Sequence, residues 1–299
     1  MNRRFAMQII PASLFLGAGD APADGSHAGL ASYYDRHLAL LDGTAWEWQG
    51  QGTPRPAREG VVQVGAGRRS FALRAGGALL AWTDDAAGAA VLQREVAAFA
   101  AGASGWFAID RARALWHART GEPARGIAED VVAACIGDGA DYYVGRDGSL
   151  FVKGLAHRGQ YGDGRLAATD GFVRTATDAV AVRAHTGHAL YLSRSGDVFG
   201  TGGNRYGPLS SHGLGDKADR WGRIFDGAVA IATGSRHSLA IRADRSLWAW
   251  GDGFRVAPRK LLDGVLAAAA GDTATLVRTG DGVWQWERGD RPRKVLPVR

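Results

Sequence analysis

The chain has 299 residues, of which 46% are hydrophobic and 22% charged, and this is the composition of a folded globular protein with a large core. The formal net charge is +6, and only four of the 36 basic residues are lysine. Outside residues 288–299 there is no concentration of basic residues of the kind that follows a phosphate backbone, so we expect no nucleic-acid partner. Two domains would fit the length, but closed all-β arrays often reach it as one domain.

The first 29 residues allow two interpretations. Asn2-Arg3-Arg4 precedes an uncharged stretch, residues 5–19, and Ala21-Pro22-Ala23 has the Ala-x-Ala form of a signal-peptide cleavage site. However, residues 13–17 resemble a strand segment at residues 149–154, which favours a closing N-terminal strand instead. The protein is secreted or periplasmic if residues 1–23 are cleaved and cytoplasmic otherwise. The uncharged stretch is too short to span a bilayer.

One pattern then occurs seven times between Leu30 and Trp286. Each copy predicts a strand of small residues, a second apolar strand, a glycine-containing turn and a strand that carries aromatic residues. The aromatic strands start at Trp46, Leu80, Trp116, Phe151, Phe199, Trp248 and Trp284. A fourth strand fits residues 90–93 in one copy and residues 259–262 in another. Four short strands per copy, repeated about every 35 residues, predict an all-β propeller.

Two segments resemble the regulator of chromosome condensation repeat family. Gly234-x-x-His237-Ser238-Leu239-Ala240-Ile241 with Leu247-Trp248-x-Trp250-Gly251 has the form of the family repeat, and Gly159-Gln160-Tyr161-Gly162-Asp163-Gly164 closely matches the family's Gly-Gln-Leu-Gly-x-Gly loop. The resemblance covers residues 30–299 and implies a single seven-bladed propeller of four-stranded antiparallel blades. Most copies are shorter than the usual family repeat, and four of the seven lack its histidine.

Residues that recur at one position of the repeat are interpreted as structural. These are the histidines of the repeat and the tryptophans at the third position of the aromatic strand: His37, His188, His237, Trp48, Trp82, Trp250 and Trp286. A buried tryptophan ring removes about 150–250 Å² from water, which is enough to explain these rings as packing between blades. The single cysteine, Cys135, lies in an apolar strand and is expected to be buried and inert. No ligand set with credible spacing is present, so we expect no metal and no cofactor.

Two long inserts, residues 155–171 and 203–223, interrupt the regular spacing of the repeat. In repeat proteins such insertions map to loops on one face, and these loops commonly bind partners. Trp, Tyr and Arg are the residues that most often anchor interfaces. The predicted partner contacts are therefore Trp221, Tyr206, Arg205, Arg220, Tyr161 and Arg158.

These observations favour a non-catalytic, monomeric, protein-binding propeller that presents rim loops to a protein partner as an enzyme inhibitor or a scaffold. If the N-terminus is cleaved, the chain is similar in architecture to the secreted beta-lactamase inhibitory protein propellers. Two alternatives stay open. One is an enzyme, a lyase or hydrolase, with its pocket at the central channel. The other is an effector or exchange factor that acts on a small GTPase.

Overall fold

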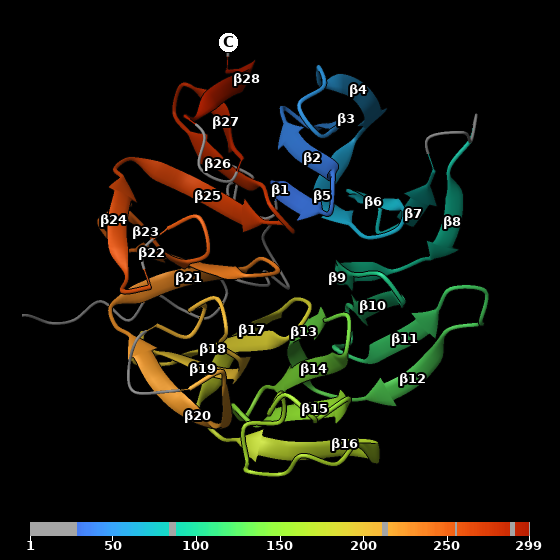
Figure 1. Cartoon of the computed structure of the whole chain (residues 1–299). Helices are drawn as coiled ribbons and strands as arrows, with labels where there is room; N and C mark the ends of the chain where they lie inside the picture. The colour runs from blue at the N-terminus through green and yellow to red at the C-terminus, as the bar shows by residue number, and fades with distance from the viewer. Residues whose placement is uncertain (1–28, 84–87, 211–214, 255, 288–290, 299) are drawn as a thin grey trace, which may run out of the picture.

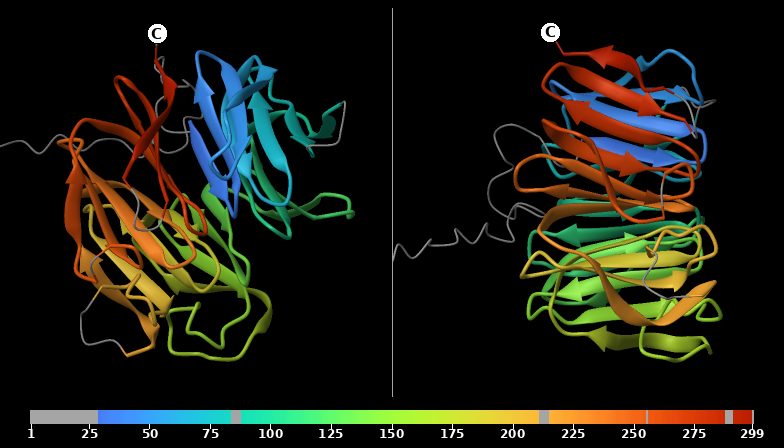
Figure 2. Two further views of the ribbon diagram at one scale, coloured as in Figure 1. Left: turned by 45° about the horizontal axis from the view of Figure 1, so that its top comes forward. Right: turned by 60° about the vertical axis from the view of Figure 1, so that its left-hand side comes forward.

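Seven four-stranded sheets are arranged in a ring around a central axis (Figures 1 and 2). The computed structural model describes residues 29–299 except 84–87, 211–214, 255, 288–290 and 299. The predictions made for the N-terminal segment therefore concern residues outside the described part, apart from Gly29. No helix occurs in the described residues, and so none that could cross a membrane. The prediction of an all-β, seven-bladed propeller is confirmed.

Each blade consists of four consecutive antiparallel strands. Blade 1 contains β1 (Leu30–Tyr33), β2 (Arg36–Leu41), β3 (Thr44–Gln49) and β4 (Arg55–Glu59). Blade 2 contains β5 (Val61–Ala66), β6 (Ser70–Arg74), β7 (Leu79–Trp82) and β8 (Ala90–Gln93). Blade 3 contains β9 (Val96–Ala101), β10 (Gly105–Asp110), β11 (Leu115–Arg119) and β12 (Arg125–Ala128). Blade 4 contains β13 (Val131–Ile136), β14 (Ala140–Gly145), β15 (Leu150–Gly154) and β16 (Thr169–Ala176).

The remaining three blades follow the same order. Blade 5 contains β17 (Ala179–Ala184), β18 (His188–Ser193), β19 (Val198–Gly203) and β20 (Lys217–Phe225). Blade 6 contains β21 (Ala228–Thr233), β22 (His237–Arg242), β23 (Leu247–Gly251) and β24 (Arg259–Leu262). Blade 7 contains β25 (Val265–Ala270), β26 (Thr275–Thr279), β27 (Gly282–Trp286) and β28 (Arg293–Pro297). In Figure 1 the colours run once around the ring, so that blade 1 and blade 7 lie side by side.

The innermost strands carry small residues because seven of them converge on the axis. They surround a channel of about 780 Å³ whose wall is rich in alanine, for example at residues 267–270. The second strand of each blade lies deepest in the core, and all six residues of β18 are buried. The fourth strands lie at the outer rim and are largely exposed, as in β8. This gradient from axis to rim is what a closed ring of sheets packed face to face requires.

The third position of the aromatic strand faces the preceding blade. The indole Nε1 of Trp82 donates to Glu47 Oε2 at 2.8 Å, that of Trp250 to the carbonyl of Pro208 at 2.7 Å, and that of Trp48 to Gln285 Oε1 at 2.9 Å. Each bond therefore joins two neighbouring blades. Trp286 is half-buried and packs with the cluster between blades 6 and 7.

The repeated histidines also lie between elements of the fold. His188 Nε2 is 3.0 Å from Ser238 Oγ of the next blade, and His237 Nε2 is 2.9 Å from Thr275 Oγ1 of the next blade. His37 Nδ1 lies 2.9 Å from Ser32 Oγ within blade 1. These contacts are consistent with our interpretation that the histidines hold strands and blades together.

Antiparallel connectivity gives the ring two distinct faces. We call one the loop face: it carries the turns between first and second strands and the longer loops between third and fourth strands. The opposite face, the turn face, carries the tight hairpins between second and third strands and the connections between blades. Both long inserts lie between third and fourth strands, in blades 4 and 5, and therefore on the loop face.

Candidate functional site

The insert of blade 4 begins with the Gly-Gln-Tyr-Gly-Asp-Gly loop, residues 159–164, and this loop is packed directly on blade 5. Gly164 N donates to Asp219 O at 2.7 Å, and Trp221 N donates to Gly162 O at 3.0 Å, so the loop pairs with the start of β20. Thr201 Oγ1 of β19 donates to Gly159 O at 2.8 Å. The loop is thus a bridge between two blades as well as a surface feature.

The three glycines of this loop are required by that close approach. Gly159, Gly162 and Gly164 all have positive φ, at 86°, 73° and 92°. A Cβ atom would overlap backbone of β20 at Gly159, the ring of Trp221 at Gly162 and the guanidinium of Arg220 at Gly164. Only glycine meets both conditions, which is the physical reason for the spacing of the motif.

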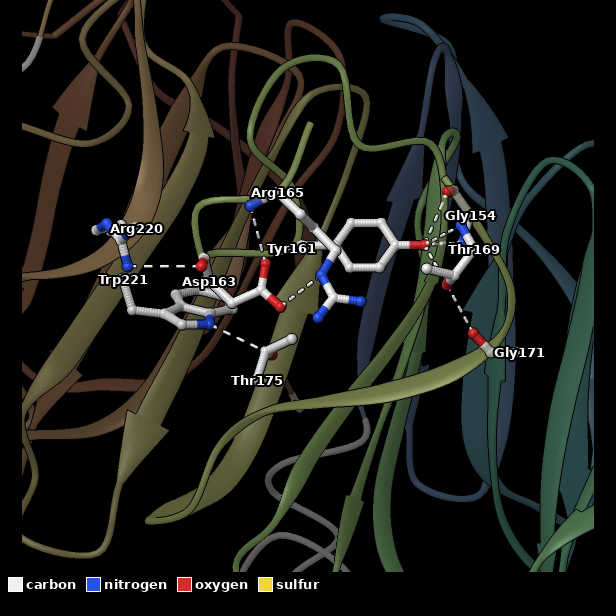
Figure 3. A network of polar contacts seen from close by, with 9 residues as sticks. All are labelled: Gly154, Tyr161, Asp163, Arg165, Thr169, Gly171, Thr175, Arg220 and Trp221. Carbon is white, nitrogen blue, oxygen red and sulfur yellow. Dashed lines mark hydrogen bonds and ion pairs between the residues drawn. The ribbon is translucent and has the colours of Figure 1, made fainter. Parts of the chain in front are cut away.

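Tyr161, which we predicted to contact a partner, is fully buried. Its hydroxyl donates to Gly154 O at 3.0 Å and accepts from Thr169 N at 3.1 Å, so it joins the end of β15 to the start of β16 (Figure 3). A side chain with no exposed surface cannot touch a partner directly. The prediction is therefore wrong for Tyr161, which acts within the fold.

Trp221 is half-buried. Its ring covers Gly162, meets Tyr191 edge-on at 4.9 Å between centroids, and points Nε1 at Thr175 Oγ1 at 3.4 Å. Much of its surface is thus used for packing between blades 4 and 5. Part of the ring stays accessible beside the exposed Arg220, so its predicted contact with a partner stays a prediction.

The insert of blade 5 contains a second copy of the same loop, which the sequence analysis did not identify. Gly207 N donates to Asn204 O at 2.8 Å and Ser210 N to Gly207 O at 3.0 Å, just as Gly159 N donates to Ala156 O at 2.7 Å and Gly162 N to Gly159 O at 3.0 Å. In both copies the residue two positions after the first glycine is fully buried: Tyr161 in one and Leu209 in the other. Gly207 and Leu209 have the same spacing as Gly159 and Tyr161, and this spacing was the sequence signal for the second loop.

The equivalence of the two loops assigns equivalent places to Arg158 and Tyr206. Each is the residue before the first glycine, each is exposed, and each lies over the first turn of the next blade. Arg158 lies against Gly187, and the ring of Tyr206 stacks under the guanidinium of Arg236 at 4.4 Å. Two of the residues predicted from sequence therefore project in register from neighbouring blades.

Exposed apolar side chains gather on the same part of the loop face. The described residues contain seven large exposed hydrophobic side chains, and four of them lie in the loops between third and fourth strands of blades 4 to 6: Leu155, Leu166, Tyr206 and Val256. They are 41–48% exposed. Val256 contacts Gly207, so blades 5 and 6 form one continuous surface there. Leu155, Leu166 and Val256 could not be predicted from the sequence, because a lone aliphatic residue in a loop gives no signal of exposure or binding.

Positive charge without a partner accompanies these apolar residues. Within the described residues, Arg158, Arg205 and Arg220 form no ion pair with a carboxylate. By contrast, Arg165 pairs with Asp163 at 2.8 Å and Arg236 with Asp252 at 3.7 Å. We call the surface formed by Leu155, Arg158, Leu166, Arg205, Tyr206, Arg220, Trp221 and Val256 the blade 4–6 surface.

A separate polar cluster lies at the loop-face end of the channel. Tyr33 donates to Asp138 Oδ1 at 3.2 Å across the axis, and Thr186 Oγ1 donates to Asp138 Oδ2 at 3.3 Å. His185 Nδ1 lies 2.8 Å from Thr186 Oγ1, and its Nε2 is buried without a hydrogen-bond partner. Burial lowers the pKa of His185 and, together with Asp138, raises that of Tyr33. The enzyme alternative would apply to this cluster. No group of residues able to hold a metal ion occurs in the described ranges.

The repeat matches a known family of repeats. The model of the regulator of chromosome condensation (RCC1) repeat matches residues 228–255, which span β21 to β23 and the loop after them. Blade 6 thus carries an RCC1 repeat, and the chain resembles RCC1-type propellers. Human HERC2, an E3 ubiquitin-protein ligase, is 28% identical over 179 residues. That match covers 50% of this chain but only 4% of the length of HERC2.

Solved structures share the fold. Prp20p of Saccharomyces cerevisiae superposes with a TM-score of 0.68 at 17% identity, over 81% of this chain and 80% of that chain. Human WBSCR16 superposes with a TM-score of 0.55 at 16% identity, over 89% of this chain and 81% of that chain. For Prp20p, binding to Gsp1p and histones has been studied, and a complex with Kap60 has been solved. Both structures are thus similar to the present chain in fold.

Proposed function

We propose that this propeller is a protein-binding module that uses the blade 4–6 surface. The observation that carries the proposal is the coincidence, on three adjacent loops of one face, of exposed apolar side chains with arginines that lack a carboxylate partner. Contiguous apolar patches edged by polar groups mark interaction sites. Exposed Tyr and Arg side chains are the residue types that supply most of the binding energy in such sites.

The surface chemistry indicates the kind of partner. Three guanidinium groups without a carboxylate partner favour a protein surface with exposed carboxylates, and the apolar residues near them favour aliphatic or aromatic contacts. The loops are held by Asn204, whose Oδ1 accepts from Leu209 N at 3.0 Å, and by the paired backbone of residues 162–164. Because the described loop residues are fixed by these bonds, little ordering entropy is lost on binding.

Three more specific functions would use such a surface and would differ in the protein that it binds. An enzyme inhibitor would cover the mouth of an enzyme, a scaffold would hold two proteins, and an exchange factor would bind a small GTPase. The fold shared with Prp20p, studied for its binding to Gsp1p, is compatible with the last of these. We favour the non-catalytic binding function, because the blade 4–6 surface is explained by contact with a protein and by no chemistry of its own.

The proposal is tested by replacing Arg205 and Tyr206 together by alanine. The full chain is immobilised, extracts of the native host are passed over it, and retained proteins are quantified by mass spectrometry. We expect a protein that the wild type retains and the double variant loses, with an affinity reduced about tenfold to hundredfold when measured with the purified partner.

The matched control is the double alanine variant at Val91 and Arg94. This pair also combines an exposed apolar residue with an exposed arginine, but it lies at the outer rim of blade 2. The control variant should retain the partner as the wild type does. Equal binding by the Arg205/Tyr206 variant would reject the blade 4–6 surface as the binding site.

A further inference from the structure

A second pocket, of about 220 Å³, lies between blades 3 and 4. It is lined by His117, Arg119 and Arg125 of blade 3 and by Asp141, Lys153 and Phe172 of blade 4. It is separate from the central channel, and none of its residues belongs to the blade 4–6 surface. Its volume suits a small molecule, since a cavity of about 150 Å³ accommodates benzene.

This pocket exists because the repeat departs from its own pattern in blade 4. At four of the seven interfaces the third position of the aromatic strand carries a tryptophan, and Trp82 and Trp250 fill the space in this way. In blade 5 that position is Thr201, which donates instead to Gly159 O of the loop packed on it. In blade 3 that position is Ala118, but Trp106 on the neighbouring strand packs in its place. Blade 4 has no tryptophan at either position. Lys153 stands at the third position of its aromatic strand, and Asp141 stands opposite it on the neighbouring strand.

The polar side chains at the same positions are paired elsewhere in the ring. Ser238 and Thr275, which correspond to Asp141, each contact a histidine of the preceding blade at 3.0 and 2.9 Å. Glu47, which corresponds to His117, accepts a hydrogen bond from Trp82. Between blades 3 and 4 the histidine of the repeat is replaced by Gly105, and the equivalent bonds are missing from the described residues.

Asp141 is the residue that most clearly points to a ligand. It is only 9% exposed and lines the pocket, yet within the described part of the chain its carboxylate has neither a hydrogen bond nor an ion pair. It stands directly opposite Lys153 in the pairing of β14 with β15. Burial raises the pKa of Asp141 to about 6, against the opposing effect of Arg119 and Lys153. The oxygens of Asp141 are not among the fully buried atoms that lack a partner, so the carboxylate faces the pocket, where a ligand can reach it.

The charges around the pocket favour an anion beside that carboxylate. Arg119, Arg125 and Lys153 supply three positive charges, against the two carboxylates of Glu122 and Asp141. Burial also lowers the pKa of His117, so its imidazole is neutral at physiological pH and offers one donor and one acceptor. Guanidinium and ammonium groups bind carboxylate and phosphate through short, charge-assisted hydrogen bonds.

We propose that the pocket between blades 3 and 4 binds a small organic anion that also carries a hydroxyl group. The anionic group, a phosphate or a carboxylate, is held by Lys153 and the two arginines, and the hydroxyl donates to Asp141. The pocket limits the ligand to about ten non-hydrogen atoms. This site is independent of the blade 4–6 surface, so either proposal stands if the other fails.

The test is isothermal titration calorimetry of the full chain with two probes, glycerol 3-phosphate and malate. The first presents a hydroxyl beside a phosphate and the second a hydroxyl beside carboxylates, so the two arms distinguish the anionic groups. Sulfate and glycerol serve as reference ligands, because sulfate lacks the donor and glycerol lacks the charge. We expect at least one probe to bind more tightly than both references.

Two variants connect binding to the pocket. Lys153→Met keeps the length of the side chain and should weaken the bound probe about tenfold or more, because one charge-assisted hydrogen bond is lost. Asp141→Asn should remove most of the preference for the probe over sulfate. The matched control, Lys260→Met, makes the same change on the exposed strand β24 and should leave binding unchanged.

A third variant restores the pattern of the repeat. Lys153→Trp places an indole where Trp82 and Trp250 stand in other blades, so it should fill the pocket and abolish binding of the probe. The site is rejected if neither probe binds the wild type better than sulfate and glycerol. It is also rejected if Lys153→Met and Lys153→Trp, both shown to be folded by circular dichroism, bind the probe as the wild type does.

Discussion

At the scale of single residues, His37 and His188 are neutral parts of the core. The hydroxyl of Ser238 donates to Pro208 O at 2.9 Å, so it can only accept from His188, whose Nε2 therefore carries a proton. A second proton would place a buried charge at Nδ1. Burial, with a smaller effect of His185 and His237, accordingly lowers the pKa of His188 to about 3. The pKa of His37 is lowered to about 4, again mainly by burial.

The lowered pKa of His188 predicts that the folded protein loses stability in mild acid. Below about pH 6.5 the unfolded chain binds a proton at this histidine that the folded protein does not bind until about pH 3. The free energy of unfolding therefore decreases as the pH falls through this window, by about 1.4 kcal/mol per pH unit for one histidine. His188→Gln keeps a donor for Ser238 and cannot be protonated. In urea unfolding its stability should decrease less steeply than that of the wild type between about pH 6.5 and pH 5.

The titration of Asp141 changes the free energy of unfolding in the opposite direction as the pH falls. Its folded pKa of about 6 lies above the usual value of 3.8, so ionisation at neutral pH costs stability that is recovered as the pH falls. The wild type therefore shows the sum of both effects, while the difference between wild type and His188→Gln isolates the histidine. Parallel curves for these two proteins would show that His188 is not kept neutral by the fold.

At the scale of elements, the strands could be predicted from sequence much better than the loops. The predicted fourth strands at residues 90–93 and 259–262 agree with β8 and β24, because turn signals and alternation are local properties. The burial of Tyr161 could not be read in this way, since it depends on a hydrogen bond to Gly154 and on packing against the next blade. The pocket beside Asp141 could not be predicted from the sequence either, because residues of two blades form it.

The bridging loop of blade 4 gives a prediction at this scale. Gly162→Ala should destabilise the protein by about 2–4 kcal/mol, because alanine is strained at a φ of 73° and its methyl group would overlap Trp221. Gly171→Ala is the matched control, since a Cβ atom there meets no atom within 4 Å and its φ is not positive. Its stability should lie within about 0.5 kcal/mol of the wild type. Urea unfolding measures both.

A double-mutant cycle separates strain from overlap. In the Trp221→Ala background the space beside residue 162 is empty, so Gly162→Ala should cost clearly less there than in the wild type. The remaining cost reports the backbone strain alone. An unchanged cost in the two backgrounds would mean that the indole ring does not press on this loop.

At the scale of the whole molecule, the ring is closed without a shared strand. In the described residues blade 1 consists only of β1 to β4 and blade 7 only of β25 to β28, so the two chain ends meet through side chains. The contact contains Leu41, Trp48, Leu276 and Val283. At its centre the buried amide of Gln285 accepts from Trp48 Nε1 at 2.9 Å and donates to Gly50 O at 2.9 Å.

The closure predicts where the ring opens first. Gln285→Leu leaves the indole N–H of Trp48 and the carbonyl of Gly50 without these partners, which should cost about 2–4 kcal/mol. Because no strand among the described residues joins blades 1 and 7, the cost should appear as local opening, and amide hydrogen exchange should accelerate in β1–β4 and β25–β28 more than in β13–β16. The matched control is Gln63→Leu, which removes the bonds from Gln63 to the backbone of Phe99 at 2.8 and 3.2 Å between blades 2 and 3. Since blades 2 and 3 are also joined through the chain, this variant should lose similar stability without faster exchange in blades 1 and 7. Equal acceleration around the whole ring in the Gln285→Leu variant would mean that the propeller unfolds as one unit and that its closure is no weaker than any other interface.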